Sequence, residues 1–455
     1  MSHPLASSFR DPNGFVFLEN NTLLRQVNPS YKKDYDHFIK SGLYEKLVSQ
    51  YLLIPHVEKK FTRAKYPHAY KILAPQTIQF ISYPYEWTFS QWQDAALTTL
   101  KVQKIALEYG MTLKDASFFN IQFYQGRPVL IDSLSFTLYH PGEPWIPYRQ
   151  FCEHFLAPLA LMSYGDIRLG QLTKTYSDGI PLDLAHTLLP FSSYLSVPLV
   201  FHIHLHAAMQ NKTKVHIAHN TNSFSTASLA ELLESLTSSV TRLKWKPKPT
   251  HWSAYYENSS YSQRAFADKI RIVNRWLDKT NPKLVWDLGA NQGAFSRLAS
   301  KKSMYTVAFD NDFATVEHNY KQSRKIHDEY LLPLVMDLTN PSPDLGFAHA
   351  ERSSLTKRGP ADIVMALALI HHLAIAGNIP FAKIATFFHR LGKVFIIEFI
   401  PKSDQMIQTM LVNREDVFDN YTQTEFERCF KRLFTIKDVV RIKDSGRILY
   451  FMQAK

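Results

Sequence analysis

The sequence contains few cysteines and no long apolar run. The two cysteines, Cys152 and Cys429, are too few for a disulfide framework and show no zinc-type spacing, which fits a reducing cytoplasm. The longest stretch without Asp, Glu, Lys or Arg covers residues 184–211 and is interrupted by Pro190 and Pro198. A spanning helix needs about 20 predominantly apolar residues. We therefore predict a buried helical pair here and no transmembrane segment.

The amino-terminal residues also lack a basic region followed by an apolar stretch, which is the pattern of a secretory signal. The net charge of +12 is compatible with nucleic acid, an anionic surface or an acidic substrate as partner. However, the basic residues are dispersed, and the densest clusters, at 57–65 and 242–250, lack interleaved aromatic residues. We interpret the charge as solvated surface and expect a cytoplasmic protein without a nucleic-acid partner; nothing in the sequence specifies an oligomeric state.

A chain of 455 residues exceeds the size at which a single core stops growing, so two domains are expected. We predict one domain over residues 1–210, a polar linker with a connecting helix over 211–250, and a second domain over 251–455. In the second domain a helix at 262–278 is followed by short strands, apolar on both faces, that alternate with helix-length segments. This pattern indicates an α/β fold with a parallel sheet, and the last two strands are predicted to form a hairpin.

The stretch "LKDASFFNIQF" (113–123) follows a strong helix pattern over 90–109. Asp115 is followed five positions later by Asn120, just before an apolar strand pattern, which is the spacing of a protein-kinase catalytic loop. Asp132 follows the next strand pattern. These three residues resemble the base and the two metal-binding positions of the kinase-like fold, which includes small-molecule phosphotransferases.

Several features of the kinase pattern are missing. Leu113 replaces the loop histidine, "DSL" replaces D-F-G, and no glycine lies between Gly14 and Gly42. The nearest basic residue to the usual lysine position is Arg25. Without the phosphate cradle and the lysine, phosphoryl transfer loses most of its electrostatic stabilisation. We predict a degenerate α+β kinase-like domain that binds the acceptor or a partner; an active small-molecule phosphotransferase is the alternative.

The histidines of "HIHLHA" form another candidate cluster. In a strand, His202, His204 and His206 would share one face, whereas in a helix only His202 and His206 would align. No carboxylate stands at ligand spacing and the surrounding patterns are helical. We therefore expect no metal site.

The stretch "VWDLGANQGAF" ends a predicted strand and opens a helix, with Gly289 and Gly293 in the turn. A nicotinamide site prefers G-x-G-x-x-G, because a pyrophosphate must approach bare backbone at the helix start. Here the spacing is G-x-x-x-G, and Asp287 precedes the first glycine. A carboxylate at this place repels phosphate and pairs with an ammonium group, and S-adenosylmethionine (SAM) offers an ammonium, a sulfonium and no phosphate.

The next two strands also end in aspartate. Asp310 stands about 20 residues after the first glycine, where an acidic residue binds ribose hydroxyls. Asp337 then ends "LPLVMD" and is placed to accept from the adenine amine. Carboxyl ends of parallel strands meet at one edge, where ligands bind. The predicted SAM-binding residues are Asp287, Gly289, Ala290, Asn291, Gly293, Asp310, Asn311, Asp337, Leu338 and Ala366.

With these motifs, residues 252–455 resemble a class I SAM-dependent methyltransferase domain with a Rossmann-like sheet. The whole chain, through "LKDASFFNIQF", "HIHLHA", "VWDLGANQGAFSR", "ALALIHHLA" and "REDVFDNYT", is similar to the methyltransferases grouped with the nodulation protein NoeA. The resemblance implies a seven-stranded sheet with a reversed last strand and SAM as methyl donor. By analogy with the nodulation family, the expected acceptor is a hydroxyl of a glycan or of a small metabolite.

Methyl transfer is an in-line displacement that depends mainly on positioning, which supplies ~7–11 kcal/mol, while a general base adds ~10²–10⁴-fold. The stretch "ALALIHHL" (366–373) lacks the D/N-P-P-Y/F pattern of enzymes that methylate base amines. We name His372 as candidate base; packing over the cofactor is the alternative role. Tyr255, Tyr256 and Tyr261 are candidates to cover the cofactor. A scaffold that binds SAM without transfer is the non-enzymatic alternative.

Overall fold

The structure, a computed structural model, describes residues 4–62, 65–210, 225–248, 262–412 and 415–455. It divides into two compact units. The first unit comprises Met1–Lys246 and the short segment Leu345–Arg352, and the second comprises Pro247–Asp344 and Ser353–Lys455. Among the described residues, no helix combines the length and the apolar character needed to cross a bilayer.

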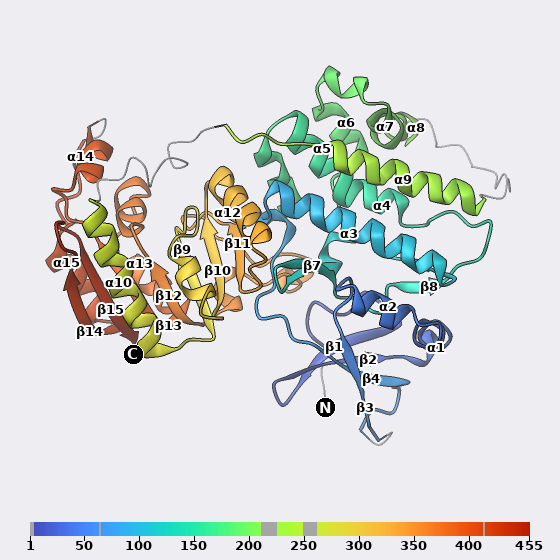
Figure 1. Cartoon of the computed structure of the whole chain (residues 1–455), viewed down its shortest axis with the longest axis horizontal. Coiled ribbons are helices and arrows are strands. Elements are labelled where there is room, and N and C mark those ends of the chain that lie inside the picture. Colours follow the sequence, from blue (N-terminus) through green and yellow to red (C-terminus); the bar gives the residue numbers. More distant parts are fainter. Residues whose placement is uncertain (1–3, 63–64, 211–224, 249–261, 413–414) are drawn as a thin grey trace. The chain divides into compact units, whose positions relative to one another are not determined.

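The first unit contains a four-stranded antiparallel sheet in the order β1-β2-β4-β3 and two two-stranded sheets, β5-β8 and β6-β7 (Figure 1). Its strands are β1 (Gly14–Glu19), β2 (Thr22–Val27), β3 (His56–Lys59), β4 (Lys71–Pro75), β5 (Met111–Leu113), β6 (Ile121–Tyr124), β7 (Arg127–Leu130) and β8 (Phe136–Leu138). Its helices are α1 (Lys32–Lys40), α2 (Leu43–Ser49), α3 (Phe89–Glu108), α4 (Tyr148–Phe151), α5 (Ala157–Tyr164), α6 (Leu182–Leu188), α7 (Val197–Leu199), α8 (His206–Gln210) and α9 (Thr226–Arg242).

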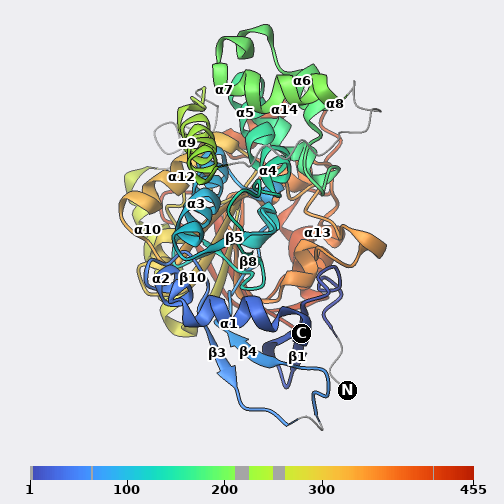
Figure 2. The same ribbon diagram turned by 90° about the vertical axis from the view of Figure 1, so that its right-hand side faces the viewer.

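Helix α3 is the helix predicted over 90–109. It begins with a capping box in which Thr88 and Gln91 satisfy each other's backbone amides. Helix α9 lies alongside α3 in both views (Figures 1 and 2), and Gln93 donates to the carbonyl oxygens of Val240 (2.7 Å) and Leu243 (3.0 Å). The connecting helix is thus packed within the first unit, while residues 211–224 of the predicted linker lie outside the described residues.

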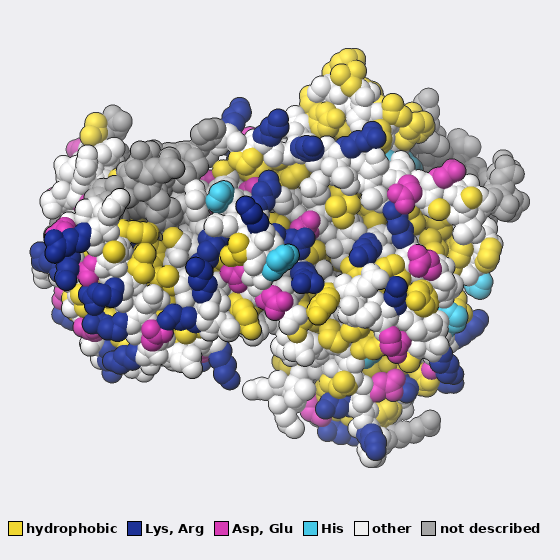
Figure 3. All heavy atoms as spheres, in the orientation of Figure 1, with side chains coloured by type: hydrophobic (Ala, Val, Ile, Leu, Met, Phe, Trp, Pro, Cys, Tyr) yellow, Lys and Arg dark blue, Asp and Glu magenta, His cyan; other side chains and the backbone are white. Residues whose placement is uncertain are grey.

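The charge-free stretch 184–211 is helical over much of its described part, and α6 contacts α8. However, it is not wholly buried, because Phe191 and Leu195 are 82% and 83% exposed. The prediction of a buried pair was wrong for this part, since the short helical turn Phe191–Leu195 carries both side chains at the surface. On the face drawn in Figure 3, Lys and Arg side chains are scattered among acidic and apolar ones.

The second unit contains a seven-stranded sheet in the order β11-β10-β9-β12-β13-β15-β14. Its strands are β9 (Leu284–Leu288), β10 (Tyr305–Asp310), β11 (Leu331–Val335), β12 (Ala361–Ala366), β13 (Gly392–Phe399), β14 (Phe434–Arg441) and β15 (Ile448–Ala454). Its helices are α10 (Gln263–Thr280), α11 (Ser296–Ser300), α12 (Phe313–Lys325), α13 (Phe381–His389), α14 (Gln405–Leu411) and α15 (Gln423–Lys431). Strands β9 to β13 are parallel, and β15 is antiparallel to both of its neighbours, as the resemblance implied.

Both faces of this sheet are covered, which explains why its strands are apolar throughout. On one face, side chains from β9, β12 and β13 form a core with α10, in which Trp276 is fully buried. On the other face Phe395 of β13 stacks on Phe388 of α13, with ring centroids 6.1 Å apart. Because successive strand residues point to opposite faces, the α10 face receives Val285 and Asp287 of β9.

Candidate active site

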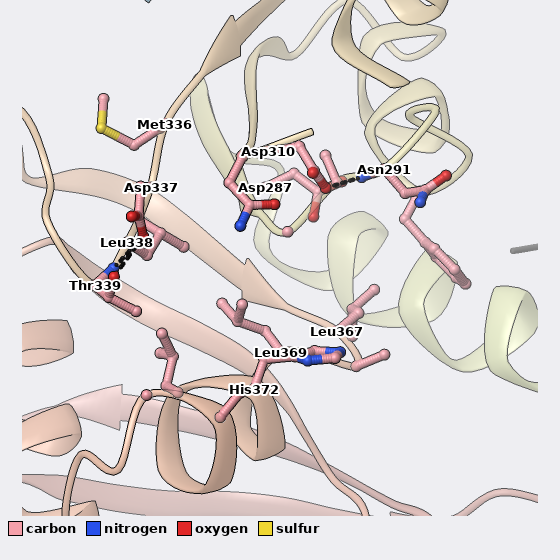
Figure 4. A pocket seen from close by; sticks show the side chains of 18 of the residues that line it. Asp287, Asn291, Asp310, Met336, Asp337, Leu338, Thr339, Leu367, Leu369 and His372 are labelled. Carbon is pink, nitrogen blue, oxygen red and sulfur yellow. Dashed lines mark hydrogen bonds between the residues drawn. The ribbon is translucent and has the colours of Figure 1, made fainter. Parts of the chain in front are cut away.

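A cavity of about 410 Å³ lies beyond the carboxyl ends of β9, β10, β11 and β12 (Figure 4). Strand β9 connects to β10 on one side, while β12 lies on its other side, so the cavity sits where the strand order reverses. The cavity is lined by Phe266, Lys269, Asp287, Gly289, Ala290, Asn291, Phe295, Asp310, Asn311, Met336, Asp337, Leu338, Thr339, Leu367, Ala368, Leu369, His372, Leu373, Ala376 and Gly377.

The turn after β9 depends on its two glycines. Gly289 has a φ of +74°, and a Cβ added there would lie 3.2 Å from the Cδ1 of Leu369 across the cavity. Gly293 has a φ of +80°, and a Cβ there would lie 2.6 Å from the side-chain nitrogen of Asn319 in α12. Gly289 therefore keeps the cavity open, whereas Gly293 lets the turn pack on α12 and does not line the cavity.

Asp287 and Asp310 lie beside each other at the ends of adjacent strands (Figure 4). Asp287 is 2% exposed and accepts a hydrogen bond from the Ser296 hydroxyl (2.6 Å). Asp310 is half-buried and accepts from the backbone amides of Asn291 (2.7 Å) and Asp312 (2.9 Å). Burial raises the pKa of each carboxyl to about 6, against the lowering effect of these hydrogen bonds.

The third predicted carboxylate follows β11. Asp337 is exposed and accepts hydrogen bonds from the backbone amide (2.8 Å) and the hydroxyl (2.7 Å) of Thr339. Met336 and Leu338 flank it in the cavity wall. The structure thus brings the three aspartates to one cavity, with Asp337 on a different wall from the other two (Figure 4).

The fourth wall follows β12. Ala366 is fully buried as the last residue of β12 and does not line the cavity, whereas Leu367, Ala368 and Leu369 do. Ala366 was predicted to contact the cofactor, but the cavity lining begins one residue later, at Leu367. The reason is that Ala366 still belongs to β12, and the chain turns toward the cavity only after the strand has ended. His372 lines the cavity at the start of a helical turn (Figure 4).

The neighbouring histidine has a different environment. His371 is 2% exposed, and its Nδ1 has no hydrogen-bond partner among the residues that the structure describes. Burial, with His372 and other nearby basic groups, holds its pKa well below the usual range. The imidazole at position 371 is therefore neutral, and only the one at 372 faces the cavity.

Sequence reasoning missed Lys269, Phe266 and Phe295 on the side of α10 and α11. A signal for Lys269 was present, because the apolar stripe of α10 carries this single lysine between Ala265 and Ile272. A charged residue within a buried stripe requires a partner or a function.

The kinase-like positions lie in the first unit. Asp115 accepts from the side-chain amides of Asn120 (2.9 Å) and Gln150 (2.7 Å). Asp132 forms an ion pair with Arg25 of β2. Burial alone would raise the pKa of Asp132, but Arg25 and local hydrogen bonds lower it below its usual value.

The histidines of 202–206 lie in a helical segment, so the strand alternative is wrong. His202 bonds to the hydroxyls of Tyr148 (2.8 Å) and Ser235 (2.9 Å), and His204 bonds to His186 (2.8 Å). Within the described part of the chain, no group of three or more His, Cys, Asp or Glu is arranged to hold a metal ion. The proposed tyrosines 255, 256 and 261 lie outside the described residues.

The strand order and the cavity together define the class of this protein. A parallel sheet with a reversed last strand, and an acidic cavity at its switch point, is the architecture of class I SAM-dependent methyltransferases. The residues that line the cavity fit SAM. The carboxyls of Asp287 and Asp310 have raised pKa values and favour a cationic ligand. Asp287 also stands just before the glycine turn, where a negative charge would repel the pyrophosphate of a dinucleotide.

The chain belongs to the family of the nodulation protein NoeA. It is 32% identical to "Nodulation protein NoeA" of Rhizobium meliloti (strain 1021) over 455 residues, which cover 98% of this chain and 95% of that protein. No family model matches the chain.

Two solved structures show partial similarity. The PH0226 protein from Pyrococcus horikoshii OT3 has a TM-score of 0.33 and 16% identity, covering 44% of this chain and 96% of its own. Magnesium protoporphyrin IX methyltransferase (ChlM) from Synechocystis PCC 6803, with bound SAH, has a TM-score of 0.33 and 15% identity, covering 45% and 93%.

Proposed function

We propose that this protein transfers a methyl group from SAM to a hydroxyl of a glycan or of a small metabolite. The observation that supports this most directly is the cavity at the switch point, which combines the carboxyls of buried Asp287 and half-buried Asp310 with one histidine on the opposite wall. The absence of the D/N-P-P-Y/F pattern after β12 argues against the amines of nucleic-acid bases as acceptors, while the hydroxyl and the glycan rest on family analogy alone.

In this proposal each of the three aspartates binds a different part of the cofactor. Asp287 pairs with the α-ammonium group, Asp310 accepts from the ribose hydroxyls, and Asp337 accepts from the adenine amine. The glycine turn from Gly289 to Asn291 and the side chains of Asn311 and Leu338 enclose the nucleoside. The raised pKa values of Asp287 and Asp310 support this assignment, because a positively charged ligand stabilises the ionised carboxylates.

His372 is the proposed general base. SAM supplies an electrophilic methyl group when bound. The imidazole of His372 takes the proton of the acceptor hydroxyl as its oxygen forms the new bond to the methyl carbon. The carbon–sulfur bond breaks with its electron pair kept on sulfur, so the products are a methyl ether and S-adenosylhomocysteine (SAH).

The test is a methyl-transfer screen with labelled SAM against glycan and metabolite fractions, followed by His372→Ala. We expect transfer to fall by about 10²–10⁴-fold while SAM affinity changes little. The matched control is His318→Ala, which removes an exposed histidine on α12 of the same unit. Unchanged transfer in His372→Ala would reject the base assignment. SAM binding by the wild-type protein without transfer to any fraction would favour the scaffold alternative.

We also propose that the first unit is a degenerate kinase-like domain that serves as a binding module. Its support is the Arg25–Asp132 ion pair, because the carboxylate expected to hold a metal already has a cationic partner from β2. We expect ATP with Mg²⁺ to leave the melting temperature unchanged. A rise that Asp132→Ala removes would instead support the phosphotransferase alternative.

A further inference from the structure

Lys269 is buried in the wall of the cavity. It belongs to the apolar stripe of α10, its side chain is 3% exposed, and it lines the cavity. An ammonium group in such a place carries a large desolvation cost unless an opposite charge lies close. The lysine therefore depends on its partners in the second unit.

Its main partner is Glu398 of β13. The Nζ of Lys269 donates to the Oε2 of Glu398 at 2.7 Å, and Glu398 has no exposed side-chain surface. The same oxygen accepts from the backbone amide of Ala368 at 2.8 Å, and Ala368, with a φ of +51°, lines the cavity. Glu398 thus fixes both the ammonium group and the loop after β12.

Strand register places this ammonium group near Asp287. Residues two apart on a strand share a face, so Glu398 lies on the same face as Ile396, and Asp287 on the same face as Val285. Ile396 and Val285 both belong to the core that packs on α10. Burial lowers the pKa of Lys269 and raises that of Asp287, and the attraction between the two opposite charges partly offsets both shifts. Both side chains line the cavity.

We propose that Lys269, held in place by Glu398, binds the α-carboxylate of SAM beside the α-ammonium group at Asp287. The amino-acid end of SAM is a zwitterion, and it is matched by one fixed cation and one fixed anion. The nucleoside end is neutral and needs only the acceptors at Asp310 and Asp337. Glu398 acts as a positioning residue. This inference rests on the proposed cofactor site and adds to it the group that selects the carboxylate.

The experiment measures binding of three ligands by calorimetry: SAH, decarboxylated SAH, and 5′-methylthioadenosine, which lacks the amino-acid end. In the wild-type protein we expect SAH to bind about 10–100-fold more tightly than decarboxylated SAH, since a charge-assisted hydrogen bond is lost. The affinity for 5′-methylthioadenosine provides the reference for an intact nucleoside site.

The variant combines Lys269→Met with Glu398→Gln, because the single lysine change would leave a buried carboxylate without its ammonium partner. We expect this protein to lose the preference for SAH while its affinity for 5′-methylthioadenosine stays within a few-fold of wild type. Lys269→Arg keeps the charge and is expected to retain part of the preference. The matched control is Lys279→Met, at an exposed position of the same helix.

Two outcomes would overturn the carboxylate assignment. The first is a double variant that still prefers SAH over decarboxylated SAH. The second is an equal loss of affinity for all three ligands, which would give the pair a structural role only. If the wild-type protein bound none of the three ligands, the cofactor site itself would be wrong, and this failure is distinct from the other two.

Discussion

The affinity for SAM should fall as the pH drops from 7.5 to 5, because the cavity contains two carboxyls that titrate in this range. Burial raises the pKa of Asp287 and of Asp310 to about 6. Below this pH the carboxyls become protonated and neutral, and a neutral carboxyl attracts neither an ammonium nor a sulfonium group. Binding of the cation therefore competes with binding of a proton.

The magnitude follows from the size of the shift. If the bound ligand returns one carboxyl to its ordinary pKa of about 4, the affinity at pH 5 is about tenfold lower than at pH 7.5. Two independent carboxyls would give about 100-fold, and their mutual repulsion places the expected value between these limits. Above pH 7.5 the dependence on these two groups should disappear, because both are already ionised.

Calorimetry in two buffers of different ionisation enthalpy measures both the affinity and the number of protons exchanged. We expect net proton release on SAM binding between pH 5 and 6, and almost none at pH 7.5. Circular dichroism at each pH provides the control that the protein stays folded. Asp310→Asn in the same experiment should reduce the number of protons released at pH 5.5.

An affinity that is constant between pH 5 and 7.5 in folded protein would refute the reasoning. Net proton uptake at pH 5.5 would be equally contradictory. Either result would mean that the carboxyls of Asp287 and Asp310 do not pair with the positive charge of the ligand, and the electrostatic basis of the cofactor assignment would be lost.

Three further predictions follow from the same cavity. Asp310→Asn should weaken SAH binding by about 10–100-fold, through loss of charged hydrogen bonds to the ribose, as measured by calorimetry. Asp287→Asn should stabilise the ligand-free protein at pH 8 by about 1–3 kcal/mol in urea unfolding, with a gain that shrinks below pH 6. The raised pKa means that the native state binds the proton more tightly than the unfolded chain, so ionisation destabilises it; an equal gain at pH 4.5 would contradict this. Gly293→Ala should cost about 1–3 kcal/mol of unfolding free energy, because a Cβ would meet Asn319 and the backbone has a positive φ. An unchanged urea midpoint would show that Asn319 moves aside.

Several features of the site could be predicted from short stretches of sequence. Each of Asp287, Asp310 and Asp337 ends or follows an apolar strand pattern, and parallel strands bring their carboxyl ends to one edge. The local sequence pattern was therefore sufficient to predict that these three residues line one cavity. It was less reliable for individual contacts. Gly293 lies in the turn after β9 and Ala366 is the last residue of β12, but neither lines the cavity, since contact depends on the direction of the chain after each strand.

The sequence by itself determined the order of elements in the second unit and the acidic character of its ligand site, because strand periodicity and turn chemistry are local properties. Only the tertiary structure decided which distant charges neutralise each other. Lys269 and Glu398 are separated by 129 positions, and Arg25 and Asp132 by 107. Such pairs form because a buried charge must find an opposite charge, and no local pattern specifies which one the fold brings within reach.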